Sequence, residues 1–134
     1  MAKKMISKPT DAELEILQIL WEYGPSSVRL VNEKLNETRN VAKKEIGYTT
    51  TLKLMQIMLE KGLVGRNTDT RTHIYLAAAK ELETQQRLLN QFVDAAFRGS
   101  AMKLVLQALD KHEASQEELD EIKALIEKIE KEGK

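Results

Sequence analysis

Residues 41–78 constrain the fold of this chain more than any other stretch. A basic, Thr-rich segment leads into a long apolar-rich run that stops at Lys61-Gly62. A short apolar strand pattern at residues 63–64, a polar turn over residues 67–70 and an alternating strand over residues 72–76 follow directly. Gly at the end of a helical run, and then alternation of polar and apolar residues, are typical of a helix followed by a hairpin. The stretch therefore predicts one helix that runs into a two-stranded hairpin.

A helix feeding directly into a hairpin is typical of the winged form of helix-turn-helix. In that fold the helix enters the major groove of DNA and the hairpin contacts the flanking backbone. We therefore interpret residues 1–78 as an N-terminal winged-helix DNA-binding domain with a small two- or three-stranded wing. The first functional hypothesis is a repressor that binds double-stranded operator DNA in a sequence-specific way.

The distribution of charge agrees with this hypothesis, although the formal net charge at pH 7 is zero. Residues 1–78 contain 12 Lys and Arg against 9 Asp and Glu, an excess of three positive charges. Residues 79–134 contain 9 against 12, an excess of three negative charges. A basic front half and an acidic back half suit a DNA-reading domain followed by an association domain.

The chain contains no cysteine. Disulfides, thiolate metal sites and Cys nucleophiles are therefore excluded, and the composition suits a reducing compartment. The first ten residues have no long apolar segment, which argues against a signal peptide or a membrane span. We expect a cytoplasmic protein.

The first helix is expected to begin at Thr10, which has Glu13 at the capping-box spacing. It should end at Gly24-Pro25, because Gly suits a left-handed cap and Pro cannot continue the turn. Residues 1–8 ahead of it form a basic arm that either contacts a phosphate or simply frays.

A second helix is expected over residues 28–37, capped by Ser26 or Ser27. In a helix-turn-helix the start of this helix faces a phosphate, where backbone N–H groups and the positive end of the helix dipole are well placed. Ser27 and Arg29 are therefore candidate DNA contacts. Capping by the serines alone is the alternative interpretation.

The candidate recognition helix covers residues 48–61 and starts with three consecutive threonines. β-branched residues suit a helix start better than its interior, and their hydroxyls and methyls can approach phosphates, base edges and the thymine methyl. Two inward-facing sets remain open: Thr51, Leu54, Met55 and Met58, or Leu52, Met55 and Leu59. Lys53 and Gln56 face outward in both cases, as DNA contacts or as an ordinary surface stripe.

The connection over residues 38–47 is basic, and Arg66 and Arg71 flank the turn of the hairpin, with His73 placed on its second strand. These wing residues either contact phosphates or protect an exposed strand edge. Together the candidate DNA contacts are Ser27, Arg29, Lys43, Lys44, Tyr48, Thr49, Thr50, Lys53, Gln56, Arg66, Arg71 and His73. His73 and the other histidine, His112, lie in separate segments without ligand spacing, so no metal site is expected.

Three amphipathic helices are expected in residues 79–134, where we place a C-terminal dimerisation domain. The first covers residues 80–98, the second follows a cap at Ser100, and the third covers residues 116–132 after a capping box at Ser115 and Glu118. The turn between the last two is expected over residues 110–114. The chain as a whole is therefore predicted to be mainly α (α+β).

Three short helices have little to pack against inside one chain. Their apolar faces would be exposed in a monomer, and such patches usually mark a partner surface. The candidate dimerisation residues are Leu88, Leu89, Phe92, Phe97, Val105, Leu109, Leu119, Ile122, Leu125, Ile126 and Ile129. A symmetric homodimer would place two recognition helices about 34–36 Å apart, one turn of B-DNA, and so match a palindromic operator.

Several motifs, in order, resemble the penicillinase-repressor family, which includes the methicillin-resistance and copper-transport-operon repressors. They lie at residues 9–17 leading to Leu20-Trp21, and at residues 48–52, 60–64, 71–75 and 99–106. The resemblance covers nearly the whole chain. It implies an N-terminal winged helix, a C-terminal helical dimerisation domain and repression by occupancy of an operator.

The resemblance also implies how repression ends. In β-lactam-responsive members, a membrane-bound sensor metalloprotease system causes the repressor to be cut within its dimerisation domain. The corresponding position here is Gln107-Ala108, where well-known members have Asn-Phe. The copper-responsive branch ends in a Cys-rich motif, which this chain lacks.

Two other classes of function agree less well with the sequence. An enzyme is disfavoured, because no Ser-His-Asp set, Gly-rich phosphate loop or HExxH motif is present. A winged-helix adaptor for protein interactions, without sequence-specific DNA binding, is the alternative. No cofactor and no small-molecule ligand are predicted.

Overall fold

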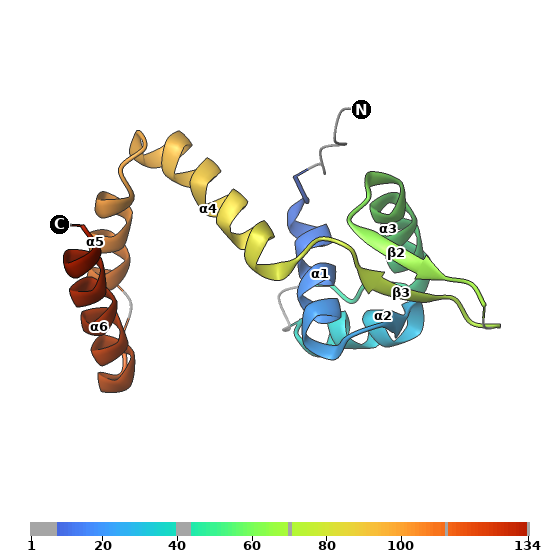
Figure 1. Ribbon diagram of the computed structural model, residues 1–134. Helices are drawn as coiled ribbons and strands as arrows, with labels where there is room; N and C mark the ends of the chain where they lie inside the picture. Colours follow the sequence, from blue (N-terminus) through green and yellow to red (C-terminus); the bar gives the residue numbers. More distant parts are fainter. Residues whose placement is uncertain (1–7, 40–43, 70, 112, 134) are drawn as a thin grey trace, which may run out of the picture. The chain divides into compact units, whose positions relative to one another are not determined.

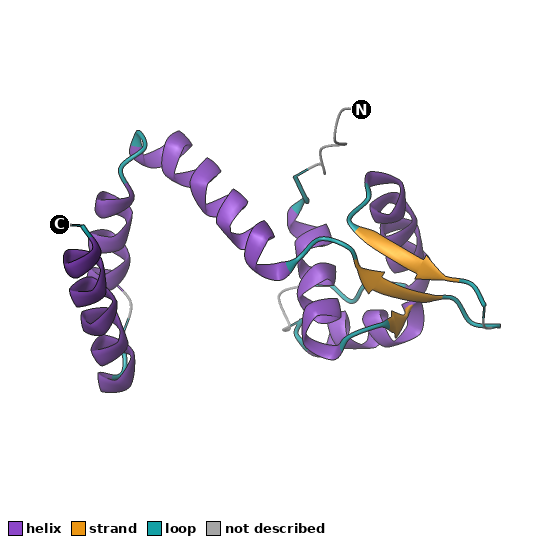
Figure 2. Cartoon of the chain, in the orientation of Figure 1, coloured by secondary structure: helices purple, strands orange, loops and turns teal. Residues whose placement is uncertain are grey.

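The computed structural model describes residues 8–39, 44–69, 71–111 and 113–133 (Figure 1). In order, its elements are α1 (Asp11–Tyr23), β1 (Ser26–Ser27), α2 (Val28–Glu37), α3 (Tyr48–Lys61), β2 (Val64–Asn67), β3 (Ile74–Ala77), α4 (Glu81–Phe97), α5 (Ala101–Lys111) and α6 (Gln116–Glu132). Helices predominate over one small sheet (Figure 2), so the predicted mainly α winged-helix fold with a helical C-terminal region is confirmed.

The chain forms two compact units, Met1–Leu88 and Leu89–Lys134. Helix α4 contributes its first turns to unit 1 and the rest to unit 2. The predicted domain boundary after residue 78 stays a prediction.

Capping side chains begin the first helices where the sequence predicts them. Glu13 N donates to Thr10 Oγ1 at 3.2 Å and Thr10 N donates to Glu13 Oε1 at 3.0 Å, which completes the capping box of α1. Leu30 N donates to Ser27 Oγ at 3.1 Å, so Ser27 caps α2. The Ser26 hydroxyl donates instead to Gly24 O at 2.7 Å.

The wing is a three-stranded antiparallel sheet in the order β1-β3-β2. Tyr75 in β3 pairs with Ser26 on one side and Arg66 on the other. Strand β3 begins at Ile74, so the prediction that His73 lies on the strand is wrong by one residue. Strand β2 reaches Asn67, which was predicted to lie in the turn, because its pairing with Ile74 extends the ladder.

The core of unit 1 is apolar and is drawn from α1, α2, α3 and the sheet. Its fully buried members include Ile16, Leu17, Val31, Met55 and Met58. Burying each such side chain stabilises the fold by about 1.5–3 kcal/mol. The result is a scaffold against which one side of α3 packs.

Two long-range polar contacts fasten the edges of this core. The indole Nε1 of Trp21 donates to Ala79 O at 2.8 Å, which holds the start of the segment leading into α4. Lys61 Nζ lies 2.9 Å from each carboxylate oxygen of Glu13, and the Glu13 side chain is only 2% exposed. This ion pair ties the last residue of α3 to the first turn of α1.

Unit 2 differs from unit 1 in having almost no core. Among its described residues only Val93 is a buried hydrophobic residue. Nine large apolar side chains are exposed instead: Leu89, Phe92, Met102, Val105, Leu106, Leu109, Leu125, Ile126 and Ile129. Helix α5 reaches Lys111, so the turn predicted from residue 110 begins later. The predicted capping box of Ser115 and Glu118 is confirmed.

The Glu13–Lys61 pair predicts a pH-dependent stability. Burial opposes ionisation of Glu13, but the hydrogen bonds from Lys61 and Thr10 and the charge of Lys61 outweigh it and hold the pKa of this carboxyl below its ordinary value of 4.5. The pair therefore stabilises the fold fully above about pH 4.5, and this contribution is lost as pH falls through the lowered folded-state pKa.

Glu13→Gln keeps a capping-box side chain but removes the charge. We expect it to lower the free energy of unfolding at pH 7 by about 1–3 kcal/mol, measured by urea unfolding followed by circular dichroism. The difference from the wild type should shrink toward zero at lower pH. Glu22→Gln, at an exposed position of α1, is the control and should have little effect. A difference that persists unchanged at low pH would contradict the ion-pair interpretation.

Candidate nucleic-acid interface

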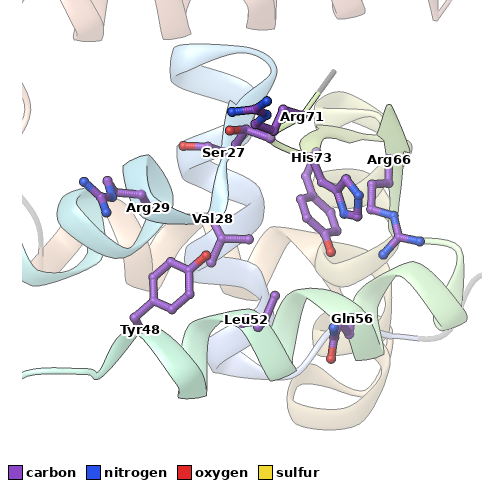
Figure 3. A pocket seen from close by; sticks show the side chains of 11 residues that line it. Ser27, Val28, Arg29, Tyr48, Leu52, Gln56, Arg66, Arg71 and His73 are labelled. Carbon is purple, nitrogen blue, oxygen red and sulfur yellow. The ribbon is translucent and has the colours of Figure 1, made fainter. Parts of the chain in front are cut away.

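A hollow of about 660 Å³ lies between α2, α3 and the wing (Figure 3). Its lining residues are Ser27, Val28, Arg29, Tyr48, Leu52, Gln56, Arg66, Arg71, Thr72, His73 and Tyr75. Seven of the twelve predicted DNA contacts are in this set: Ser27, Arg29, Tyr48, Gln56, Arg66, Arg71 and His73. The structure therefore brings residues from three separate segments to one place.

The local fold explains how α3 presents one stripe to the hollow. Tyr48, Leu52 and Gln56 are spaced by four residues, so they lie on the same side of the helix in successive turns. In Figure 3 they face Arg66 and His73 across the hollow. Helix and wing thus form two walls.

The inner side of α3 selects between the two facings that the sequence left open. Thr51, Met55 and Met58 are fully buried, whereas Leu52 is only partly buried and lines the hollow. The first inward set is therefore the better description. Lys53 and Gln56 are exposed, as expected for either facing.

The hollow is lined by cationic groups without a carboxylate. Arg29, Arg66 and Arg71 are all exposed, and no Asp or Glu is among the described residues that line the hollow. Guanidinium groups match phosphate geometry through paired N–H donors and stay charged at all physiological pH values. The site is therefore built to receive a polyanion.

Two residues that line the hollow are themselves buried in unit 1. Tyr75 is 1% exposed and is held in the middle strand of the sheet, while Val28 is 5% exposed at the start of α2. Because Arg66 pairs with Tyr75 in the sheet register, the backbone from which its side chain extends is fixed.

Four other predicted contacts do not line the hollow. Lys44, Thr49, Thr50 and Lys53 are exposed, and Lys53 follows Thr49 by four residues on the neighbouring stripe of α3. Lys43, the remaining candidate, lies outside the described residues, as do Thr70 and His112. The DNA-contacting role of each residue stays a prediction.

Sequence reasoning missed four lining residues: Val28, Leu52, Thr72 and Tyr75. Leu52 belongs to one of the two inward sets that the sequence leaves open, so only that interpretation places its side chain in the core. Tyr75 follows the alternation of its strand, but nothing local shows that its buried ring forms the base of a hollow. Strand β1 was also missed, because two serines carry no strand pattern.

The described residues contain neither a metal-binding cluster nor a membrane-spanning helix. Over these ranges, no three His, Asp or Glu side chains gather in a way that could hold a metal ion. No helix in the same part of the chain is long and apolar enough to span a membrane.

An exposed helix α3 beside a basic wing is the arrangement of winged helix-turn-helix proteins, a class that binds nucleic acid. The family model described as Penicillinase repressor matches residues 9–128. The chain belongs to the penicillinase repressor family and is a transcriptional repressor of that family.

Two named relatives are similar at low identity but over nearly their full length. The methicillin resistance regulatory protein MecI of Mammaliicoccus sciuri is 24% identical over 119 residues, covering 89% of this chain and 93% of the relative. The penicillinase repressor of Bacillus licheniformis is 25% identical over 124 residues, covering 92% and 93%. The named relatives are regulators rather than enzymes.

The wing arginines predict a specific salt dependence of DNA binding. Each phosphate contact that a cation makes contributes roughly 0.9 to the slope of log affinity against log salt concentration. We expect Arg66→Ala and Arg71→Ala each to reduce the magnitude of this slope by about 1, measured by fluorescence anisotropy with labelled duplex.

Two variants serve as controls for this measurement. Arg66→Lys keeps the charge and should keep the slope. Lys80→Ala removes an exposed cation that does not line the hollow, and should also leave the slope unchanged. Equal slopes for all four variants and the wild type would show that the wing does not contact phosphates.

Proposed function

We propose that this repressor binds a palindromic operator as a homodimer, with α3 in the major groove and the basic hollow against the sugar-phosphate backbone. The observation that carries the proposal is the placement of Arg29, Arg66 and Arg71 around one hollow beside the exposed face of α3. A backbone seated there leaves the exposed stripe of α3 that contains Lys53 facing base edges, and Gln56 lies at the border between this stripe and the hollow.

The exposed residues of α3 have the chemistry for base readout. Lys53 can donate to guanine O6 and N7, and Gln56 can pair with adenine N6 and N7. Thr49 and Thr50 are exposed in the first turn, where a methyl or hydroxyl can approach thymine or a phosphate. Gly47, the N-cap residue of α3, makes no side-chain capping hydrogen bond. The first backbone N–H groups of α3 are therefore not occupied by a capping side chain.

Dimerisation is proposed from the exposed apolar surface of unit 2. Leu125, Ile126 and Ile129 on α6 are each more than half exposed, as is Phe92 on α4. Removing such a side chain from water is worth about 1.5–3 kcal/mol, so covering this surface strongly favours association. A second copy of the chain is the simplest cover, because a two-fold axis uses the same patch twice.

The genes under control and the route to derepression are proposed from the relatives. Since relatives are named as methicillin resistance and penicillinase regulators, we propose control of β-lactam-resistance-type genes. Release by a membrane sensor metalloprotease system is proposed from the family resemblance of the motifs alone. The corresponding cleavage position, Gln107-Ala108, is exposed and lies inside helix α5. Proteases act on extended chain, so cutting there would require α5 to unwind locally.

Lys53→Ala tests the role of α3. We expect it to weaken binding to duplex from the chain's own upstream control region by roughly tenfold, and binding to unrelated duplex by no more than about twofold. Gel-shift titration measures both affinities. If operator affinity is unchanged, α3 does not read the operator, and the winged-helix adaptor becomes the better hypothesis.

Ile126→Asp tests the dimer. A carboxylate inside an apolar interface is costly, so we expect the dimer dissociation constant, measured by sedimentation equilibrium, to rise by at least tenfold. Lys128→Asp, an exposed polar position on the same helix, is the matched control. A wild-type chain that is monomeric at micromolar concentration would exclude the proposed assembly.

A further inference from the structure

Two asparagines one turn apart on α2 hold the chain immediately before α3. Ile46 N donates to Asn36 Oδ1 at 2.8 Å, and Asn36 Nδ2 donates back to Ile46 O at 3.0 Å. Asn32 Nδ2 donates to the same carbonyl at 2.9 Å and to Thr51 Oγ1 at 2.8 Å. We call these four residues, Asn32, Asn36, Ile46 and Thr51, the clasp.

We propose that Asn32, Asn36 and Thr51 are positioning residues that set the placement of α3 against α2, and thereby the discrimination between operator and other DNA. The inference rests on the proposed function, because it concerns how α3 reads DNA. None of the three side chains lines the basic hollow, so each acts through α3 rather than by touching the nucleic acid there.

The apolar side of α3 cannot fix this placement alone. Met55 and Met58 form most of its fully buried surface, and unbranched Met side chains adapt to shifted neighbours. Apolar burial has no preferred direction, whereas hydrogen bonds weaken steeply when they are bent or lengthened. The clasp therefore supplies the directional restraint that the apolar contacts lack.

The clasp is well suited to this role because its groups are hydrogen-bonded together. The carbonyl of Ile46 accepts two hydrogen bonds, and the Thr51 side chain is fully buried. A shift of α3 would break the Asn32–Thr51 hydrogen bond directly and strain the bonds at Ile46, two residues before the helix, leaving polar groups unpaired. The contacts also anchor the end of the α2–α3 connection at the point where α3 begins.

Small displacements of α3 affect the two kinds of DNA contact differently. Direct readout by Lys53 and Gln56 needs hydrogen-bond geometry at particular base edges. Long arginine side chains on α2 and the wing can follow a phosphate over a larger range, and their attraction does not depend on sequence. Removing hydrogen bonds of the clasp should therefore lower the discrimination between operator and unrelated DNA, and leave the affinity for unrelated DNA unchanged.

Thr51→Val removes the hydroxyl and keeps the shape of the side chain. We expect operator affinity to fall roughly tenfold, while affinity for unrelated duplex stays within about twofold of the wild type. The slope of log affinity against log salt concentration should stay unchanged for both duplexes. Thr51→Ser keeps the hydroxyl and should retain most of the discrimination. Gln18→Ala, at an exposed position of α1, is the neutral control. Thermal unfolding of each variant reports whether it is folded at the assay temperature.

Asn36→Ala is the second variant and decides the question if Thr51→Val does not fold. It removes both hydrogen bonds that Asn36 makes with Ile46. It should lower the ratio of operator affinity to unrelated-duplex affinity by a similar factor. A folded variant that discriminates as well as the wild type overturns the inference, and so does an equal loss of affinity for both duplexes. If the wild type itself does not discriminate, the proposed function fails instead, so the two failures are distinguishable.

Discussion

Burial of Thr51, Met55 and Met58 decides which side of α3 is available to DNA. These side chains pack into the core that α1 and α2 share with the sheet. Once they are inward, the stripe of Tyr48, Leu52 and Gln56 necessarily faces the wing, and the neighbouring stripe containing Lys53 faces solvent. The basic hollow then follows from the sheet register that places Arg66 beside Tyr75.

Polar contacts hold α3 at both ends, while apolar packing holds its middle. The clasp engages Thr51 and Ile46 at the start, and Glu13 engages Lys61 at the end. Each contact joins α3 to a different helix, α2 in the first case and α1 in the second. Under the proposed function, these contacts restrain the helix that reads bases, because pairing with a base edge tolerates little displacement.

The sequence predicted what local chemistry determines. Capping at Thr10 and Ser115 gave the starts of α1 and α6, and Gly24 and Gly62 gave the ends of α1 and α3. The facing of α3 stayed open, since apolar residues occupy several of its sides and only the packed core selects among them. Tyr75 at the base of the hollow and the partners of Asn36 were missed for a similar reason. Their roles depend on residues brought close by folding, which no local pattern encodes.

The bond from Trp21 to the carbonyl of Ala79 has a spectroscopic consequence. Trp21 is the only tryptophan of the chain and lies in unit 1, whereas the helices responsible for far-ultraviolet dichroism occur in both units. Indole emission therefore monitors the DNA-reading half selectively, and ellipticity averages over the whole molecule. Comparing the two signals during denaturation would reveal whether the halves melt together or in succession.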